Sequence, residues 1–152
     1  MRTQADDRYE PSTEQLHESR RRIRVASACG AAAYLLFLIV ERINGAKDPP
    51  LQRAIDVTHD VSALGLCAAL LLATYWRRVS DRHVLAMALA VELLLAALIS
   101  GSVPWATYLH TGHLPGLTWV VPIVILFALL VPAPPLTTMW VTGACVLTMP
   151  LG

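Results

Sequence analysis

The sequence LTWVVPIVILFALLVPAPP, residues 117–135, decides the class of fold. It contains no charged residue, and its last four positions include three prolines. It also belongs to a longer uncharged region, because no Asp, Glu, Lys or Arg occurs in the 60 residues that follow Glu92. A soluble domain needs a charged surface. The sequence therefore predicts an integral membrane protein.

The composition supports this prediction. The chain has 152 residues, enough for one domain, and it is 55% hydrophobic and 15% charged, with a mean hydropathy of +0.53. The first 22 residues are polar, so a cleaved signal peptide is not expected. Cys29, Cys67 and Cys145 fall in different apolar segments without CxxC spacing, and we interpret them as small packing residues.

We expect an all-α, polytopic transmembrane helix bundle. Residues 1–19 read as a polar, acidic cytoplasmic tail and the start of a juxtamembrane helix, with Ser12 as N-cap and Gln15 at N3. Residues 20–152 form the transmembrane domain. Its predicted spans, about five in number, cover residues 23–40, 57–76, 84–100, 117–131 and 136–152.

Basic residues set the expected orientation, because they are enriched on the cytoplasmic side of membrane proteins. Two clusters flank the first two spans and serve as topology markers: Arg20, Arg21, Arg22, Arg24, Arg77, Arg78 and Arg82. They place the N-terminus in the cytoplasm, with the chain crossing the membrane several times. The loop between these two spans also contains three basic residues, so the charge contrast is incomplete.

Proline and glycine mark the predicted helix boundaries. Asp48 and Pro49 suggest a helix start, as N-cap and N1. The sequence GSVP at 101–104 is expected to end the third span, followed by a short external loop at 105–116 with aromatic residues at the membrane interface. Four prolines are expected to kink the fourth span or to form the turn after it: Pro122, Pro132, Pro134 and Pro135.

Glu92 is the most conspicuous polar residue inside a predicted span. It lies about 12 Å along the helix axis from the start of its span, near the middle of the bilayer. A carboxylate at that depth costs several kcal/mol, so it is expected to face the bundle, to be neutral, or to have polar partners. By depth, Tyr34 and Thr142 could reach it. Two interpretations remain open: a proton site or buried switch, or a residue that fixes helix packing.

A second group of polar residues occurs at the predicted outer face. Asp56, His59 and Asp60 have the i, i+3, i+4 spacing of one helix face, and His110 and His113 lie in the other external loop. Carboxylates and imidazoles bind divalent metals or respond to pH. A solvated helix entrance explains the same residues. We therefore assign no metal and no cofactor.

Catalytic signatures are absent from the sequence. It contains no phosphate-binding Gly-rich loop, no Gly-x-Ser-x-Gly and no His-Glu-x-x-His. Basic and aromatic residues are not interleaved as in nucleic-acid-binding proteins. We expect neither an enzyme within these residues nor a nucleic-acid partner; the lipid bilayer, other membrane helices and a second copy of the chain are the expected partners.

Several motifs resemble one known family. Trp119-x-x-Pro122, the VPAPP at 131–135, Val91-Glu92 and the final Pro150-Leu151-Gly152 resemble the membrane module that precedes the kinase domain in some bacterial receptor-like serine/threonine kinases. In that family a basic residue typically follows the turn prolines, whereas here Leu-Thr-Thr follows.

The resemblance implies a non-catalytic anchor or sensor module for signal transduction, with a kinase domain in the cytoplasm. That placement needs an even number of spans, so it implies a sixth span beyond Gly152 and a chain that is a fragment. Two alternatives remain. One is a small transport or redox subunit that uses Glu92 and the external histidines. The other is a structural membrane protein that binds a partner through the small residues of 23–40, including Ala26 and Gly30.

Overall fold

A computed structural model describes residues 12–44, 49–113, 125 and 135–147, and these residues form helices joined by short connections, with no β-strand among them. The helices are α1 (Thr13–Asn44), α2 (Pro50–Tyr75), α3 (Asp81–Thr111) and α5 (Pro135–Leu147). The all-helical class predicted from the sequence is therefore confirmed.

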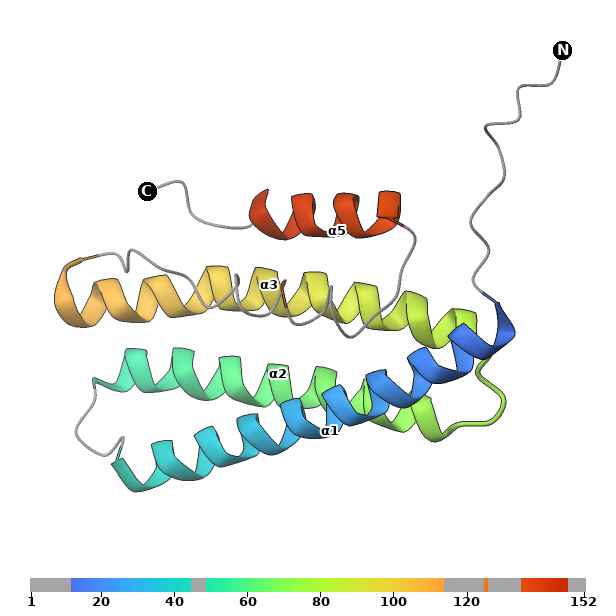
Figure 1. Cartoon of the computed structure of the whole chain (residues 1–152). Coiled ribbons are helices and arrows are strands. Elements are labelled where there is room, and N and C mark those ends of the chain that lie inside the picture. Colours follow the sequence, from blue (N-terminus) through green and yellow to red (C-terminus); the bar gives the residue numbers. More distant parts are fainter. Residues whose placement is uncertain (1–11, 45–48, 114–124, 126–134, 148–152) are drawn as a thin grey trace, which may run out of the picture.

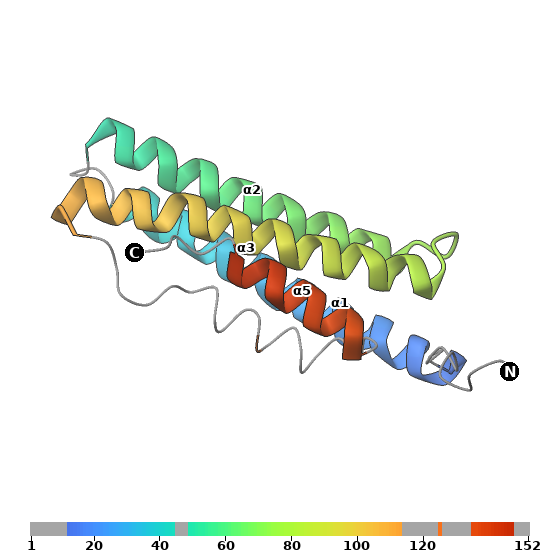
Figure 2. The same cartoon turned by 90° about the horizontal axis from the view of Figure 1, so that it is seen from above.

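The three long helices lie side by side with alternating direction (Figures 1 and 2). α1 crosses α2 at an angle and also contacts α3, whereas α5 packs along α3. Each of the three is long and apolar enough to cross a membrane. The predicted spans at 23–40 and 84–100 lie inside α1 and α3; the span at 57–76 follows α2 to its C-cap, Trp76.

α1 begins as the sequence predicts. The backbone N–H of Ser12 donates to Oε1 of Gln15 at 2.9 Å, and the N–H of Gln15 donates to Oγ of Ser12 at 3.2 Å. This reciprocal pair satisfies N–H groups that the first helical turn leaves without partners. α1 then continues for 32 residues, so the juxtamembrane helix and the first span are one helix.

Two predicted boundaries are wrong. α2 starts one residue later than expected, with Pro49 as N-cap and Pro50 as the first helical residue. α3 does not end at GSVP but continues through Pro104 to Thr111, where Gly112 adopts a left-handed φ of 70°. Apolar helices tolerate an internal proline because neighbouring groups satisfy the freed backbone atoms. The helix-ending signal of GSVP at 101–104 is therefore not decisive in this apolar helix.

This correction moves two aromatic residues from a loop onto a helix. Trp105 and Tyr108 lie on α3 with their rings stacked, their centroids 5.8 Å apart, and both side chains are exposed. An exposed aromatic pair near the end of an apolar helix still suits a membrane interface.

The remaining predicted spans are less fully described. α5 has 13 residues, or about 20 Å of helix, less than a bilayer core needs. It begins at Pro135, one residue before the predicted start of the last span. The other predicted positions of this region, 117–124, 126–134 and 148–152, with Pro122, Pro132 and Pro134, lie outside the described residues.

The core consists mainly of small and medium apolar side chains. One cluster joins the three long helices: Leu16, Ile23, Ala63, Cys67, Leu70, Val84, Leu85, Ala88, Val91 and Leu95. A second cluster, Ala96, Ile99 and Cys145, joins α3 to α5. Large side chains such as Leu36, Ile43 and Leu72 point outward instead. Apolar residues on the outside of an apolar helix fit a lipid-facing surface.

Candidate functional site

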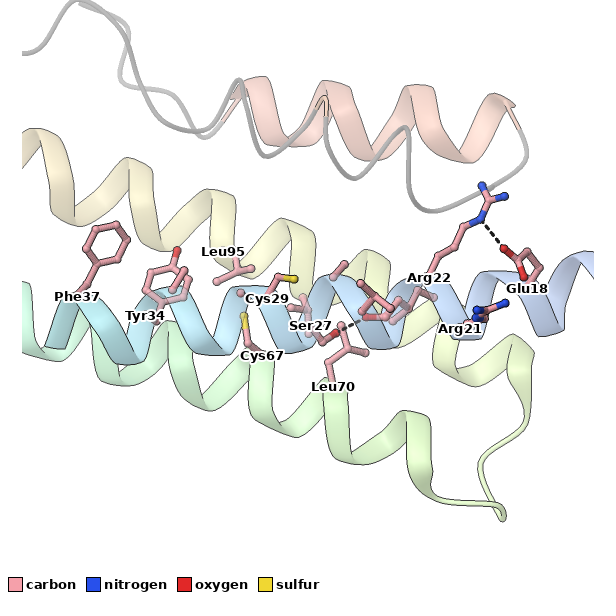
Figure 3. A pocket seen from close by; sticks show the side chains of 16 residues that line it. Glu18, Arg21, Arg22, Ser27, Cys29, Tyr34, Phe37, Cys67, Leu70 and Leu95 are labelled. Carbon is pink, nitrogen blue, oxygen red and sulfur yellow. Dashed lines mark hydrogen bonds and ion pairs between the residues drawn. The ribbon is translucent and has the colours of Figure 1, made fainter. Parts of the chain in front are cut away.

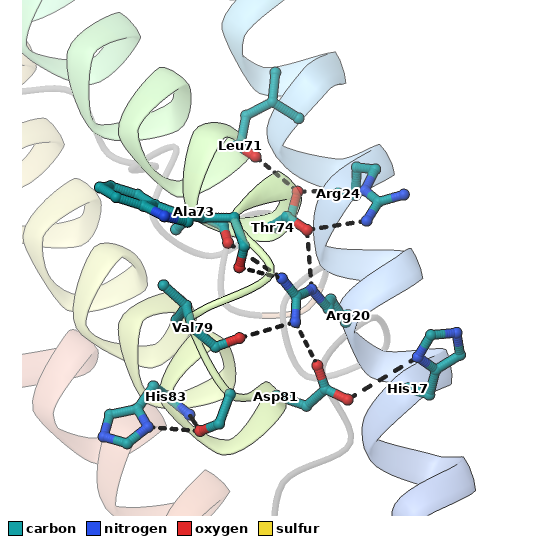
Figure 4. Close-up of polar contacts among 11 residues, drawn as sticks. His17, Arg20, Arg24, Leu71, Ala73, Thr74, Val79, Asp81 and His83 are labelled. Carbon is teal, nitrogen blue, oxygen red and sulfur yellow. Dashed lines mark hydrogen bonds and ion pairs between the residues drawn. The ribbon is translucent and has the colours of Figure 1, made fainter.

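A densely bonded polar site lies at one end of the bundle. We call this end, which comprises residues 17–24 of α1 and the turn 76–81 between α2 and α3, the charged end. Arg20 is at its centre (Figure 4). Its Nε donates to the carbonyl of Thr74 at 2.9 Å, and its two terminal nitrogens donate to the carbonyls of Trp76 and Val79, also at 2.9 Å. The same guanidinium bonds to Oδ1 of Asp81 at 2.7 Å.

Arg24, one turn further along α1, reinforces this arrangement. It donates to the carbonyl of Thr74 at 2.9 Å and to the hydroxyl of the same residue at 3.3 Å. Its guanidinium carbon lies 4.4 Å from the ring centroid of Tyr75, a cation–π contact. Arg24 therefore holds the last turn of α2 from a second position.

The start of α3 completes the site. Ser80 is the N-cap and accepts a hydrogen bond from the N–H of His83 at 3.4 Å. Asp81 in the first turn receives Arg20 on one oxygen, and Nδ1 of His17 lies 4.0 Å from the other. A carboxylate at a helix N-terminus and cations at a helix C-terminus both complement the helix dipole.

These bonds have a clear physical role. A helix leaves its last carbonyl groups without partners, and in an apolar environment that loss is costly. Arg20 and Arg24 supply donors to those carbonyls, and Arg20 connects α1, α2 and α3 through one side chain that is only 13% exposed. We call this set of bonds the Arg20 clamp.

The sequence did not predict the clamp. The sequence presents seven of its arginines alike, as topology markers, but only five of these are exposed: Arg21, Arg22, Arg77, Arg78 and Arg82. Arg20 and Arg24 lie four residues apart, on one face of a helix. Their spacing beside the buried Ile23 and Ser27 is the signal that could have separated them from the others.

Glu92 is buried, with 4% of its surface exposed. It lies where α3 meets α5, and Cys145 of α5 is within electrostatic range of its carboxylate. Thr142, predicted as a partner, is half-buried on α5. Tyr34, the other predicted partner, packs edge-on against His59 of α2, with ring centroids 5.8 Å apart. The burial expected for Glu92 is thus present, between α3 and α5.

The predicted group on α2 forms a local pair. Nδ1 of His59 lies 2.9 Å from Oδ1 of Asp60, and both side chains are 12% exposed. Nε2 of His59 is buried without a hydrogen-bond partner in the described part of the chain. Asp56 is half-buried one turn earlier. The group lies inside the bundle rather than at a fully solvated helix entrance.

The two remaining histidines follow from the longer α3. His110 belongs to the last turn of α3, and His113 is exposed just beyond Gly112. The N–H of His113 donates to Oγ1 of Thr111 at 3.2 Å, directly after the end of α3. Within the described ranges, no three side chains of His, Cys, Asp or Glu come together in a way that could hold a metal ion.

A groove of about 640 Å³ runs along one side of α1 (Figure 3). α1 supplies most of its lining, and Cys67 and Leu70 of α2 and Val91 and Leu95 of α3 supply the rest of the described lining. The lining is almost entirely apolar, except for Glu18, Arg21 and Arg22 at one end. The groove and the Arg20 clamp therefore share the charged end of the bundle.

Comparison with known proteins gives no relative. No family model, no curated protein and no solved structure matches the chain. The resemblance to a kinase membrane module therefore stays a prediction. The structure supports a coarser statement: this is a helical protein with three helices capable of crossing a membrane, and a partly buried arginine bonds all three at one end.

Proposed function

We propose that the chain is a non-catalytic membrane anchor or sensor module in a bacterial inner membrane, with the charged end in the cytoplasm. The observation that supports this proposal is the Arg20 clamp. Arg20 bonds the membrane-proximal part of α1 to both α2 and α3. About 10 Å of α1 extends from Arg20 back to Thr13. Any change in how the three helices pack would therefore move the start of α1.

The sequence resemblance gives this proposal its signalling partner. In the proposed function, a cytoplasmic serine/threonine kinase domain receives the signal, either in the same polypeptide or as a separate chain. The kinase residues would all belong to that domain. The gene sequence beyond codon 152, and its neighbouring reading frames, test this part. If no kinase reading frame occurs beyond codon 152 or in a neighbouring gene, the kinase part of the proposal is wrong and the membrane-anchor part still stands.

Reporter fusions test the placement in the membrane. A reporter fused after Val79 is expected to report a cytoplasmic location. A reporter fused after Gly112 is expected to report a location outside the cytoplasm. This follows because α3 separates the two positions by a membrane-spanning length of helix. Alkaline carbonate should leave both fusions in the membrane fraction. The opposite reporter pattern, or release by carbonate, would contradict the proposal.

A second candidate function is a small proton-coupled transport or redox subunit, and the burial of Glu92 favours it. Intramembrane carboxylates commonly mark proton pathways. If this function holds, Glu92→Gln should abolish proton movement in vesicles that carry a pH-sensitive dye, with the protein still present in the membrane. Glu92 would be a packing residue if Glu92→Gln left proton movement unchanged, or if the natural protein moved no protons.

A further inference from the structure

The groove beside α1 has the dimensions of a binding site. Its volume of about 640 Å³ falls in the range of pockets that hold small molecules. It extends along α1 from Arg21 to Phe37, a distance of about 24 Å. One leaflet of a bilayer has a hydrocarbon thickness of about 15 Å. A single extended hydrocarbon chain from one leaflet therefore fits along it.

Small residues create the hollow. Ala26, Cys29, Gly30 and Ala33 of α1 line it, and larger side chains bound it further along, including Tyr34. At Gly30 the two helices are close: a Cβ atom there would lie 3.0 Å from Sγ of Cys67. Val91 and Leu95 contribute the α3 part of the lining.

One end of the groove carries charge. Arg21 and Arg22 line it together with Glu18, while Tyr34 and Phe37 lie at the other end (Figure 3). Nε of Arg22 lies 3.1 Å from Oε1 of Glu18, with both side chains about half-exposed. Exposed pairs of this kind contribute little stability, so an anion can replace the carboxylate. The mouth has a net charge of +1, from two arginines and one glutamate.

We propose that this groove binds an anionic phospholipid from the leaflet at the charged end. One acyl chain would lie against Ala26, Cys29 and Ala33, and the phosphate would accept hydrogen bonds from Arg21 and Arg22. Basic pockets between membrane helices bind phospholipid headgroups in this way, because guanidinium donors match phosphate oxygens. The proposal needs only that α1–α3 lie in a bilayer, and is independent of any kinase.

Charge favours a lipid over the other occupants. The chain after Glu92 has no acidic side chain, so its later segments have none to offer the arginines. A second copy related by a two-fold axis along the membrane normal would bring its own Arg21 and Arg22 to the same mouth, and like charges repel. A phospholipid supplies both the apolar chain and the anion.

Native mass spectrometry tests the proposal. The delipidated full chain is incubated with phosphatidylglycerol or with phosphatidylcholine of the same acyl composition, and the bound lipids are counted. Phosphatidylglycerol should bind more tightly than phosphatidylcholine. The double variant Arg21→Gln/Arg22→Gln should weaken phosphatidylglycerol binding roughly tenfold, because charge-assisted bonds to phosphate are lost.

Matched controls separate the groove from general effects. Arg77→Gln/Arg78→Gln removes two exposed arginines at the same end that do not line the groove, and should leave binding unchanged. Ala33→Leu fills the groove and should weaken binding of both lipids, whereas Ala32→Leu on the exposed surface outside the groove should not. Binding that is unaffected by the groove variants, or equally affected by the controls, would overturn the proposal.

A crosslinking measurement covers variants that fail to fold. Phosphatidylglycerol with a diazirine in its acyl chain should label the natural protein at residues 26–33 of α1. Labelling confined to other helices would overturn the proposal. So would an oxidant-induced disulfide between Cys29 residues of two chains, because Cys29 lines the groove and a second copy would then occupy it.

Discussion

At the charged end of the bundle Arg20 bonds across to two other helices, whereas towards the opposite end His59 bonds to Asp60, its neighbour on the same helix. Both groups are largely buried, and both belong to the α1–α2–α3 bundle. The Arg20 clamp fixes how the three helices meet. The His59–Asp60 pair joins no two helices, so near it the helices are held by apolar packing and by the ring contact between Tyr34 and His59. We expect the charged end to be the more rigid of the two.

Removal of the clamp should have the largest effect. Arg20→Met would remove one donor from each of the carbonyls of Thr74, Trp76 and Val79, and would remove the arginine that pairs with Asp81. We expect a loss of about 3 kcal/mol in the free energy of unfolding, because several hydrogen bonds from one charged, partly buried group are lost together. Thermal unfolding in detergent measures it. Arg21→Met is the control, since Arg21 is exposed; an equal loss in both variants would refute the clamp.

The contact between α1 and α2 should be next in size. A side chain at Gly30 meets Cys67, while nothing lies within 4 Å of the corresponding position at Gly65. Gly30→Leu is therefore expected to cost about 2 kcal/mol through overpacking. Gly65→Leu should be neutral or stabilising, because leucine favours a helix. Stability measurements on both variants and on Gly30→Leu/Cys67→Ala, which should recover part of the loss, decide the point.

This second prediction also bears on partner binding through α1. Gly30 packs against α2 of its own chain, so a substitution there disturbs the fold before it disturbs any association. A pull-down of Gly30→Leu alone would mix the two effects. Ala32→Leu, at an exposed position of α1, is the cleaner probe of a partner surface.

The start of α1 should show a smaller, local effect. Ser12→Ala removes the acceptor for the N–H of Gln15, and loss of an N-cap costs about 1 kcal/mol. Hydrogen exchange at the amide of Gln15 is expected to accelerate roughly fivefold, with little change at the amide of Ile23. If exchange at Gln15 did not change, the capping pair would not be formed in solution.

The smallest effect is expected for the exposed pair Glu18–Arg22. Glu18→Gln should change stability by about 0.3 kcal/mol and only at low salt, because exposed i,i+4 pairs are weak and screened. Unfolding at two salt concentrations measures this difference. A loss close to that of Arg20→Met would mean that Arg22 belongs to the clamp.

Much of the fold was predictable from local patterns. The capping pair at Ser12 and Gln15, the apolar spans in α1, α2 and α3, and the burial of Glu92 all depend on short-range chemistry or on the cost of charge in an apolar medium. The end of α3 was not predictable in this way. Pro104 normally argues for a helix end, and the helix continues past it because the surrounding apolar environment rewards intact backbone hydrogen bonding.

By itself the sequence determined that this is an apolar helical protein, where its charges gather, and where its first helix begins, because these follow from composition and from contacts between residues a few positions apart. Only the tertiary structure decided which arginines are buried and which line the groove. Arg20 and Arg21 are neighbours of the same type, yet one bonds to residues more than fifty positions away and the other is exposed. Helix packing sets that difference, because two residues of the same type are distinguished only by the neighbours that the fold gives them.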